Sequence, residues 1–406
     1  MQETLEFIEQ HKHDNVRELA LKSAKNKSIN LQYALEQIEG WQIAEHKIPT
    51  WAATKGIVYP PHLSMEQCSS EETARYKQRV IAEINTSDSS LNNSMADLTG
   101  GFGIDCSFIG SMFKKGTYVE RQEHLCKTAE SNYNLLNLKH IEIINTDGCQ
   151  HLETMEPVNW LYLDPARRSA SGKKTVLIEE CEPNIIALEP LILDKSDYAM
   201  IKLSPMLDLF QAVQKLGSVC QIHVVAVRNE CKELLLILSK DGRNIAADDI
   251  PIHAFNISAD GSVQFYASTI SKEQESSCPI TDGIGAFLYE PNSAILKAGL
   301  NRSLAARFGV TKLHHNSQLY TSNTLAEDFP GRIFKVDGFC SFGKKELKEL
   351  TNGISQANIT VRNFPSTAEE LKKRLKLKDG GSVYLFATTT ASNKKTIQEY
   401  NVIDNC

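Results

Sequence analysis

The feature that most constrains the fold is a run of short apolar segments alternating with amphipathic segments between residues 95 and 203. Such alternation is typical of a parallel sheet with helices on both faces, because parallel neighbours need a crossover connection. Two longer apolar runs follow with five residues between them, which indicates an antiparallel hairpin. The sequence therefore predicts a doubly wound α/β sheet with a terminal antiparallel hairpin. In chain order we expect strand Met95–Leu98, helix Phe102–Phe113, strand Thr117–Glu120, helix Glu123–Leu138, strand Ile141–Asn145, strand Trp160–Leu163, helix Ile178–Leu191, strand Tyr198–Leu203 and the hairpin strands Gln221–Val227 and Glu233–Ser239.

Composition narrows the class of protein. The chain has 406 residues, 41% hydrophobic and 23% charged, which is typical of a globular protein with two or three domains. No apolar run approaches the about 18 residues that a membrane helix needs, and Met1–Gln10 is too polar for a secretory leader. Ten cysteines without a CxxC pair indicate buried free thiols rather than a zinc site. We therefore expect a cytoplasmic protein with neither a membrane nor a metal among its partners.

Pattern changes along the chain predict four parts. They are an N-terminal helical domain at 1–90, the sheet core at 91–245, a connecting strand-rich and helical region at 246–325, and a small α+β domain at 326–406. Ser69 and Ser366 are predicted to cap helices, each with a glutamate three residues later. From residue 331 onward there are 13 Lys and Arg against 8 Asp and Glu, although the whole chain has a net charge of −6. The C-terminal part is therefore locally basic.

The sharpest motif is Met95-Ala-Asp-Leu-Thr-Gly-Gly-Phe-Gly-Ile-Asp105, a predicted strand that ends in Asp97 and runs into a glycine-rich turn. Glycines let the backbone approach a ligand and take positive φ. A dinucleotide fingerprint needs a third glycine where Cys106 stands, so NAD is disfavoured. From this motif alone, a methyltransferase and other nucleotide-binding folds both stay open.

Acidic residues follow each of the next predicted strands. Glu120 lies 23 residues after Asp97, where a carboxylate can accept hydrogen bonds from ribose hydroxyls. Asp147 and Asp164 follow the third and fourth strands. Any one of these acids could cap a helix, but four in order favour one shared site at the carboxyl edge of the sheet.

The D-L-x-x-G-x-G arrangement resembles the first motif of class I S-adenosylmethionine-dependent methyltransferases, whose fold also ends in a reversed hairpin. The whole chain resembles bacterial methyltransferases with a C-terminal THUMP-like domain, through Trp51, Tyr59-Pro-Pro, Glu66-Gln-Cys-Ser-Ser70, Leu288-Tyr-Glu-Pro-Asn292 and Tyr320-Thr-Ser322. The resemblance implies a Rossmann-like core, a ferredoxin-like region at 246–325, a THUMP-like domain at 326–406 and S-adenosylmethionine as cofactor. It assigns cofactor binding to Asp97, Thr99, Gly101, Phe102, Gly103, Glu120, Arg121, Asp147, Gly148 and Asp164.

The segment Leu163-Asp-Pro-Ala-Arg-Arg168 is similar to the [DNS]PP[YFW] motif of amino-methyltransferases. In that motif the first side chain and the following carbonyl accept hydrogen bonds from the amine that is methylated. Ala166 replaces the second proline and Arg167 replaces the aromatic residue that stacks on the base. The resemblance implies methylation of a base in RNA (rRNA or tRNA), with Asp164, Pro165 and Arg167 as catalytic residues.

Several cations are candidates for substrate binding. Arg167 and Arg168 would hold a phosphate or stack on a base. Lys202, after the fifth strand, either borders the substrate cleft or pairs with an acid. Lys372, Lys373 and Arg374 form either the solvated end of a helix or a phosphate-binding surface.

Other functions remain open from the sequence. A second class of RNA methyltransferase uses a cysteine nucleophile just after the fifth strand, where this chain has Leu203-Ser-Pro205, so Cys231 is a weaker candidate. A non-catalytic module that binds S-adenosylmethionine or RNA is an alternative, as is a methyltransferase acting on a protein or a small molecule. The sequence indicates no oligomeric state.

Overall fold

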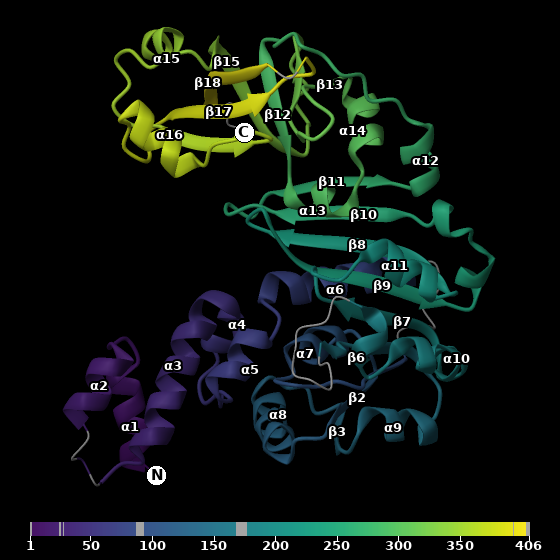
Figure 1. The fold of residues 1–406 in the computed structure, drawn as a ribbon. Coiled ribbons are helices and arrows are strands. Elements are labelled where there is room, and N and C mark those ends of the chain that lie inside the picture. The colour runs from purple at the N-terminus through teal and green to yellow at the C-terminus, as the bar shows by residue number, and fades with distance from the viewer. Residues whose placement is uncertain are drawn as a thin grey trace. The chain divides into compact units, whose positions relative to one another are not determined.

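The computed structural model describes residues 2–23, 26, 28–86, 93–167, 177–392 and 394–402. The chain divides into two compact units. The first consists of Met1–Cys220 and Leu234–Ile245, and the second of Gln221–Glu233 and Ala246–Cys406. Figure 1 shows the elements of both units by label. The four domain boundaries expected from the sequence stay predictions.

The described residues up to Asn85 form six helices, and α3 is the longest of them. Asn30 caps α3 by accepting a hydrogen bond from the Tyr33 backbone N–H, and the helix buries Ala34, Ile38 and Ala44. The cap of α6 is Ser70, which accepts from the Thr73 N–H, so the predicted cap Ser69 is wrong by one residue. The six helices are α1 (Gln2–His11), α2 (Val16–Ser23), α3 (Leu31–Lys47), α4 (Pro49–Ala52), α5 (His62–Gln67) and α6 (Glu71–Asn85).

The sheet of the first unit has the strand order β3-β2-β1-β4-β7-β9. All neighbours are parallel except β9, which runs antiparallel to β7. The chain adds strands first on one side of β1 and then on the other, so β1 and β4 flank a switch point. The doubly wound prediction is confirmed. The elements are β1 (Ser94–Asp97), α7 (Ile104–Gly110), β2 (Lys115–Glu120), α8 (Glu123–Leu135), β3 (Ile141–Asn145), α9 (Gly148–Thr154), β4 (Val158–Leu163), β7 (Ser196–Leu203), α11 (Leu209–Lys215) and β9 (Glu230–Ser239).

Between β4 and β7 the structure differs from the single helix expected at 178–191. A 3-10 turn at Ile178–Glu180 leads into β6 (Cys181–Glu182), which pairs with β5 (Ala166–Arg167), and α10 then covers Ile185–Lys195. Pro183 has no backbone N–H and disfavours helical geometry in the residue before it, so one helix cannot run through this point. Asn184 starts α10 by accepting from the Ala187 N–H.

The predicted hairpin joins β8 (Val219–Val227) to β9. The turn is Arg228-Asn229, both with positive φ, which is the geometry of a two-residue hairpin loop. At the far end of the two strands, the Ser239 N–H donates to the Ser218 carbonyl over 3.0 Å. This turn is shorter than the five residues expected, because β9 begins at Glu230.

The second unit contains two groups of strands. Strand β8 pairs in parallel with β10 (Ile252–Ile257), which pairs antiparallel with β11 (Val263–Ser268). A separate seven-stranded sheet has the order β13-β14-β12-β15-β18-β17-β16. Gly299, whose φ is +72°, separates two short helices of this unit. The remaining elements are 3-10 turns Asp241–Asn244 (which belongs to the first unit) and Ala247–Asp249, α12 (Ile270–Glu275), β12 (Phe287–Pro291), α13 (Ser293–Ala298), α14 (Asn301–Phe308), β13 (Thr311–Lys312), β14 (Tyr320–Ser322), β15 (Gly331–Ser341), α15 (Lys344–Leu350), β16 (Asn358–Arg362), α16 (Ala368–Leu375), β17 (Val383–Thr389) and β18 (Lys395–Val402).

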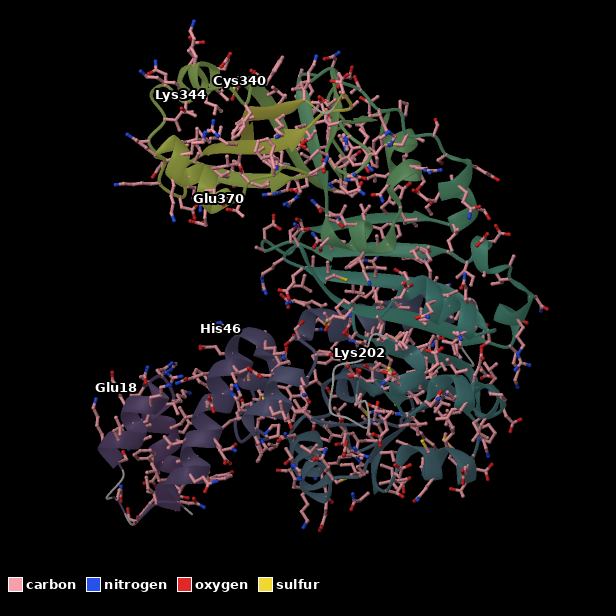
Figure 2. The ribbon with its side chains drawn as sticks, in the orientation of Figure 1. Glu18, His46, Lys202, Cys340, Lys344 and Glu370 are labelled. Carbon is pink, nitrogen blue, oxygen red and sulfur yellow. The ribbon has the colours of Figure 1, made fainter. Side chains whose placement is uncertain are left out.

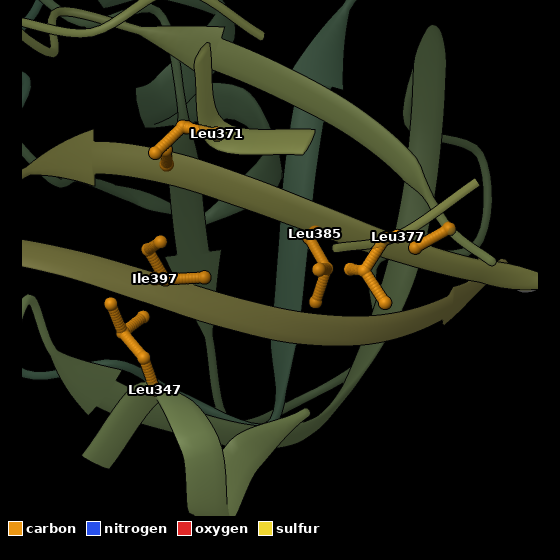
Figure 3. Close-up of a cluster of buried hydrophobic side chains, with 7 residues drawn as sticks. Leu347, Leu371, Leu377, Leu385 and Ile397 are labelled. Atoms are coloured by element: carbon orange, nitrogen blue, oxygen red, sulfur yellow. The ribbon is translucent and has the colours of Figure 1, made fainter. Parts of the chain in front are cut away.

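A compact apolar core stabilises the C-terminal part of this sheet. Leu347 of α15 and Leu371 of α16 pack with Leu385 and Ile397 from the sheet, as Figure 3 shows. Helix α16 begins with a capping box formed by Thr367 and Glu370, one residue after the predicted cap Ser366. The predicted α+β arrangement of this part is therefore present.

Two expectations from composition can be compared with the described residues. The nine cysteines from Cys68 to Cys340 are all free thiols. Across the residues that the structure covers, no helix is both long and apolar enough to cross a bilayer.

Candidate functional site

Four acids lie at the carboxyl ends of neighbouring parallel strands. Asp97 ends β1, Glu120 ends β2, Asp147 follows β3 and Asp164 follows β4. Hydrogen bonds connect the loops that carry them: the Asp164 N–H donates to Thr99 Oγ1 over 2.7 Å, and the Gly101 N–H donates to Glu120 Oε2 over 3.0 Å. The structure thus brings these residues to one edge of the sheet, at the switch point where open α/β folds bind ligands.

The glycine-rich turn is held in one conformation. Gly101 and Gly103 have φ of +56° and +89°. The Tyr118 hydroxyl donates to the Gly101 carbonyl over 2.6 Å, and the buried Tyr133 hydroxyl donates to the Gly103 carbonyl over 2.8 Å. A Cβ at Gly103 would lie 2.6 Å from that Tyr133 hydroxyl. Glycine is therefore required at 103 both for the backbone conformation and for space.

The Glu120 carboxylate is nearly buried, with 9% of the residue exposed. Its Oε2 accepts from the Gly101 N–H, and its Oε1 accepts from the Gln122 N–H over 2.8 Å. A carboxylate offers about four acceptor positions, so further donors such as a pair of hydroxyls can be accommodated. The two backbone N–H groups fix the orientation of the carboxylate, and one of them belongs to the glycine-rich turn.

Asp97 is almost completely buried, with 1% exposed. Its Oδ1 accepts from the Thr99 N–H over 2.9 Å and from the Thr99 hydroxyl over 3.2 Å. Burial above all, with the nearby carboxylates Asp105 and Asp164, raises the pKa of Asp97 to about 8. A positive ligand close to this carboxyl would favour its ionised form.

Asp147 occupies the N-cap of α9. Its Oδ1 accepts from the Cys149 N–H over 2.9 Å and from the Gln150 N–H over 3.3 Å. A Cβ at Gly148 would lie 2.2 Å from the Leu98 carbonyl oxygen, so this glycine allows α9 to approach the first loop closely. The helix-cap role of Asp147 is therefore observed, and its role in binding the cofactor stays a prediction.

Two residues assigned to the cofactor contact other side chains. Phe102 is buried, with its ring 5.0 Å from the ring of Trp51 and 6.4 Å from that of Tyr59. Arg121 is exposed and pairs with Glu182 of β6, Nη1 to Oε1, over 3.2 Å. Contacts of either residue with the cofactor stay predictions.

A buried polar group that the sequence analysis did not identify lies beside these acids. Asp105, on the first turn of α7, accepts hydrogen bonds at Oδ2 from the hydroxyls of Ser69 (2.7 Å) and Tyr162 (2.6 Å). Lys77 Nζ lies 3.0 Å from Asp105 Oδ1, and the Lys77 side chain has no exposed surface. Although burial opposes ionisation, Lys77 and Lys202 hold the pKa of Asp105 below its ordinary range. We call Ser69, Lys77, Asp105, Tyr162 and Lys202 the Asp105 cluster.

Lys202 connects this cluster to the segment Leu163-Asp-Pro-Ala-Arg-Arg168, which we call the fourth motif because it begins at the end of β4. It lies near the carboxyl end of β7 and is labelled in Figure 2. Its Nζ is 2.5 Å from Asp164 Oδ2, 3.2 Å from Ser69 Oγ and 3.5 Å from Asp105 Oδ2. Of the two interpretations offered by the sequence, pairing with an acid is observed, and one of its partners is the predicted catalytic residue Asp164.

The rest of the fourth motif is placed in part. Pro165 is buried, while the backbone of Ala166 and Arg167 forms β5 and pairs with β6. Arg168 lies outside the described residues. The substrate-binding roles given to the two arginines stay predictions.

The predicted basic group of α16 lies in the second unit. Lys372 Nζ pairs with Asp379 Oδ1 over 2.8 Å and with Glu369 Oε1 over 3.1 Å. The Arg374 guanidinium lies 4.1 Å from the centre of the Phe342 ring, and Lys373 is exposed. Two of the three cations are thus engaged by their own module, and a phosphate-binding role for them stays a prediction.

Cys231 is located on β9, in the second unit. Burial raises the pKa of its thiol to about 11. A cysteine nucleophile reacts as the thiolate, so this environment disfavours covalent catalysis by Cys231.

The C-terminal residues match two family models. Residues 287–330 match the model of a ferredoxin-like domain, and residues 331–398 match the model of a THUMP domain-like family. In the structure, β12, β13 and β14 of the first match and β15 to β18 of the second belong to one seven-stranded sheet. The two matched segments are therefore connected by backbone pairing between β12 and β15.

Similarity also extends over the whole chain. A crystal structure from Porphyromonas gingivalis W83, described as a "putative methyltransferase", is 34% identical, covers 99% of this chain and 98% of its own, and superposes with a TM-score of 0.86. Two proteins from Mycobacterium tuberculosis strains, each described as an "Uncharacterized S-adenosylmethionine-dependent methyltransferase", are 26% identical over 220 residues. That match spans 53% of this chain and 56% of theirs, so the chain spans about half the length of these curated relatives. The chain belongs to the family of S-adenosylmethionine-dependent methyltransferases with a THUMP-like C-terminal domain.

Proposed function

We propose that this chain transfers a methyl group from S-adenosylmethionine to an amino nitrogen of a base in RNA. The observation that carries the proposal is that Asp97, Glu120 and Asp164 lie at the carboxyl ends of the neighbouring parallel strands β1, β2 and β4. Hydrogen bonds connect the loops after these strands to the glycine-rich turn. Family membership supports the reaction type, and the THUMP-like match supports the substrate class.

The chemistry of this edge suits the cofactor. S-adenosylmethionine, when bound, supplies an activated methyl group on a positively charged sulfonium. Glu120 would accept hydrogen bonds from the ribose hydroxyls, and the backbone of Gly101 and Gly103 would line the nucleoside. Burial and the neighbouring carboxylates Asp105 and Asp164 raise the pKa of Asp97 to about 8, so a bound cation would favour ionisation of this carboxyl.

The acceptor would be held by Asp164 and Pro165. The side chain of Asp164 is 37% exposed, so a ligand can reach it. One carboxylate oxygen and the Pro165 carbonyl give two acceptors, which match the two N–H groups of an exocyclic amine. Holding both hydrogens orients the nitrogen lone pair in line with the methyl carbon, and Asp164 partly accepts the proton that is released.

The proposal is tested by measuring transfer of tritiated methyl groups from S-adenosylmethionine to undermodified RNA. We expect incorporation by the wild-type chain and a loss of about 100-fold or more with Asp164→Ala. Asp197→Ala is the matched control, because Asp197 lies near the amino end of β7, where it accepts a hydrogen bond from the Asn159 amide.

Three results would contradict the proposal. Transfer to protein or to a small molecule but not to RNA would change the substrate class. Saturable binding of S-adenosylmethionine without transfer to any acceptor would favour the non-catalytic module, for which Ala166 and Arg167 are the motivating departures from the motif. No binding at all would remove the cofactor assignment.

A further inference from the structure

Lys202 lies between a buried acid and an accessible one. An ammonium group has three N–H donors, and here Asp164, Ser69 and Asp105 supply an oxygen in three directions within 3.5 Å. The bond to Asp164 is the shortest of the three, at 2.5 Å. Lys202 therefore contacts Asp164, which is proposed to hold the acceptor, and at the same time two other members of the Asp105 cluster.

The inner side of the cluster is buried and holds several polar contacts. Asp105 Oδ2 receives the hydroxyl hydrogens of Ser69 and Tyr162, while Lys77 lies 3.0 Å from Oδ1 and 3.2 Å from Ser69 Oγ. Because Lys77 is completely buried, separating it from these oxygens would leave an unpaired charge in the core. The position of Lys202 is thus set by groups that cannot relax toward water.

Part of this support comes from outside the sheet. Ser69 directly precedes the cap of α6, and Lys77 lies within α6, whereas Asp105 lies on α7. Helix α6 packs against α7, which brings the two segments together. The helical N-terminal region therefore contributes side chains to the surroundings of the fourth motif.

A buried ion pair alone would be weak evidence for function, since apolar replacements are often equally stable. The distribution of exposure distinguishes this group. Side-chain exposure rises from 0% for Lys77 through 10% for Asp105 and 13% for Lys202 to 37% for Asp164. The alternating charges run from the core to the acid that a substrate can reach.

We infer that Lys202 is a positioning residue for methyl transfer, and that Ser69, Lys77 and Asp105 anchor it. By holding Oδ2 of Asp164, Lys202 leaves Oδ1 and the Pro165 carbonyl as a fixed pair of acceptors for the substrate amine. Asp164 then does not need to lose rotational freedom when the acceptor binds. This inference rests on the proposed function, and it gives Ser69, Lys77 and Asp105 a role that the resemblance to methyltransferases does not assign.

A double-mutant cycle tests the inference. Lys202→Met is expected to lower kcat for RNA methylation by about 10- to 100-fold, with Lys202→Arg restoring part of the rate. The dissociation constant of S-adenosylmethionine should change by less than about threefold, because acceptor geometry is altered and not the glycine turn. In an Asp164→Asn background, Lys202→Met should cause no further loss of rate. Independent, multiplicative losses from the two substitutions would overturn the inference.

Two further variants keep the result interpretable. Lys195→Met is the matched control and should keep the wild-type rate. Lys195 is the last residue of α10, and its ammonium group donates to the Met155 carbonyl. Ser69→Ala removes one hydroxyl from the anchor and should lower kcat several-fold with unchanged cofactor affinity. An unchanged rate with Ser69→Ala would contradict the anchoring role.

The cycle also separates this inference from the proposed function. If wild-type protein does not methylate RNA, the proposed function fails, and the coupling is read from the melting temperatures of the same variants. All three tryptophans (Trp41, Trp51 and Trp160) lie in the first unit, so tryptophan fluorescence reports its unfolding. Non-additive shifts of the melting temperature for Lys202→Met and Asp164→Asn would support the contact by which Lys202 holds Asp164. Additive shifts would overturn the inference.

Discussion

The two units use charged side chains in different ways. In the first unit, the Asp105 cluster buries its charges and pairs them in a chain that ends at the accessible Asp164. In the second unit, Lys372 pairs on the surface with Glu369 and Asp379, whose side chains are 74% and 72% exposed. Buried charges depend strongly on their partners, whereas exposed pairs contribute little. The site of this protein is therefore better recognised from where its charges are buried than from where basic residues are most numerous.

Breaking the buried pair of Lys77 and Asp105 should have the largest effect. Lys77→Met leaves the Asp105 carboxylate buried with less compensation, which we expect to lower the free energy of unfolding of the first unit by about 3–5 kcal/mol. Urea unfolding followed by tryptophan fluorescence measures this change. A loss below about 1 kcal/mol would mean that the cluster is not the buried ionic group described above.

The glycine turn gives the next effect. Gly103→Ala introduces a Cβ 2.6 Å from the Tyr133 hydroxyl at a φ of +89°, so we expect about 1–3 kcal/mol of strain and a reduced affinity for S-adenosylmethionine. The matched control is Gly261→Ala, which has a φ of +85° but no atom within 4 Å of the added Cβ, and which lies in the second unit. Equal cofactor affinity in the two variants would contradict the role of the turn.

The raised pKa of Asp97 predicts that cofactor binding depends on pH. Since that pKa is about 8, the carboxyl holds a proton in neutral solution, and a bound cation favours its release. Affinity for S-adenosylmethionine should therefore rise as the pH increases toward 8 and level off above it. For the free protein the sign is opposite: the folded state keeps a proton that the unfolded state loses near pH 4, so this group lowers stability as the pH rises from about 4 to about 8.

Calorimetry between pH 6 and pH 9 measures this dependence. Asp97→Asn is the control, because the amide has a similar shape but does not titrate in this range. A pH dependence that persists unchanged in Asp97→Asn would assign it to another group.

The smallest effects should come from α16. Lys373→Gln removes an exposed cation and should weaken RNA binding slightly, with the slope of affinity against salt falling by about one. Lys372→Gln should change binding less, because that ammonium is already paired with two carboxylates. Gel-shift titrations at several salt concentrations compare the two variants. A larger loss for Lys372→Gln would contradict the view that its charge is satisfied locally.

Most elements of the core could be predicted because each strand is a separate apolar run with a clear boundary. Helix starts were displaced by one residue where two hydroxyl side chains are adjacent, as at Ser69-Ser70 and Ser366-Thr367, since the sequence pattern does not distinguish them. The helix expected through Pro183 does not form, because proline lacks a backbone N–H and disfavours helical geometry in the residue before it.

The site was predictable only where side chains follow strand ends. Asp97, Glu120 and Asp164 could be placed together because parallel strands share an edge. The Asp105 cluster could not, since its residues come from positions 69 to 202 and meet only through tertiary packing, in part that of α6 on α7. Lys77 in particular reads as a solvated helix residue, although it lies one turn before the buried Val80 and Ile81.

Calorimetric titration with S-adenosylmethionine tests the central claim, that the carboxyl edge around Asp97 and Glu120 is a cofactor site. We predict saturable binding of one molecule per chain, lost in Glu120→Ala and kept in Glu142→Ala, whose side chain is exposed on β3. The absence of binding by the wild-type chain, or equal binding by both variants, would contradict the account.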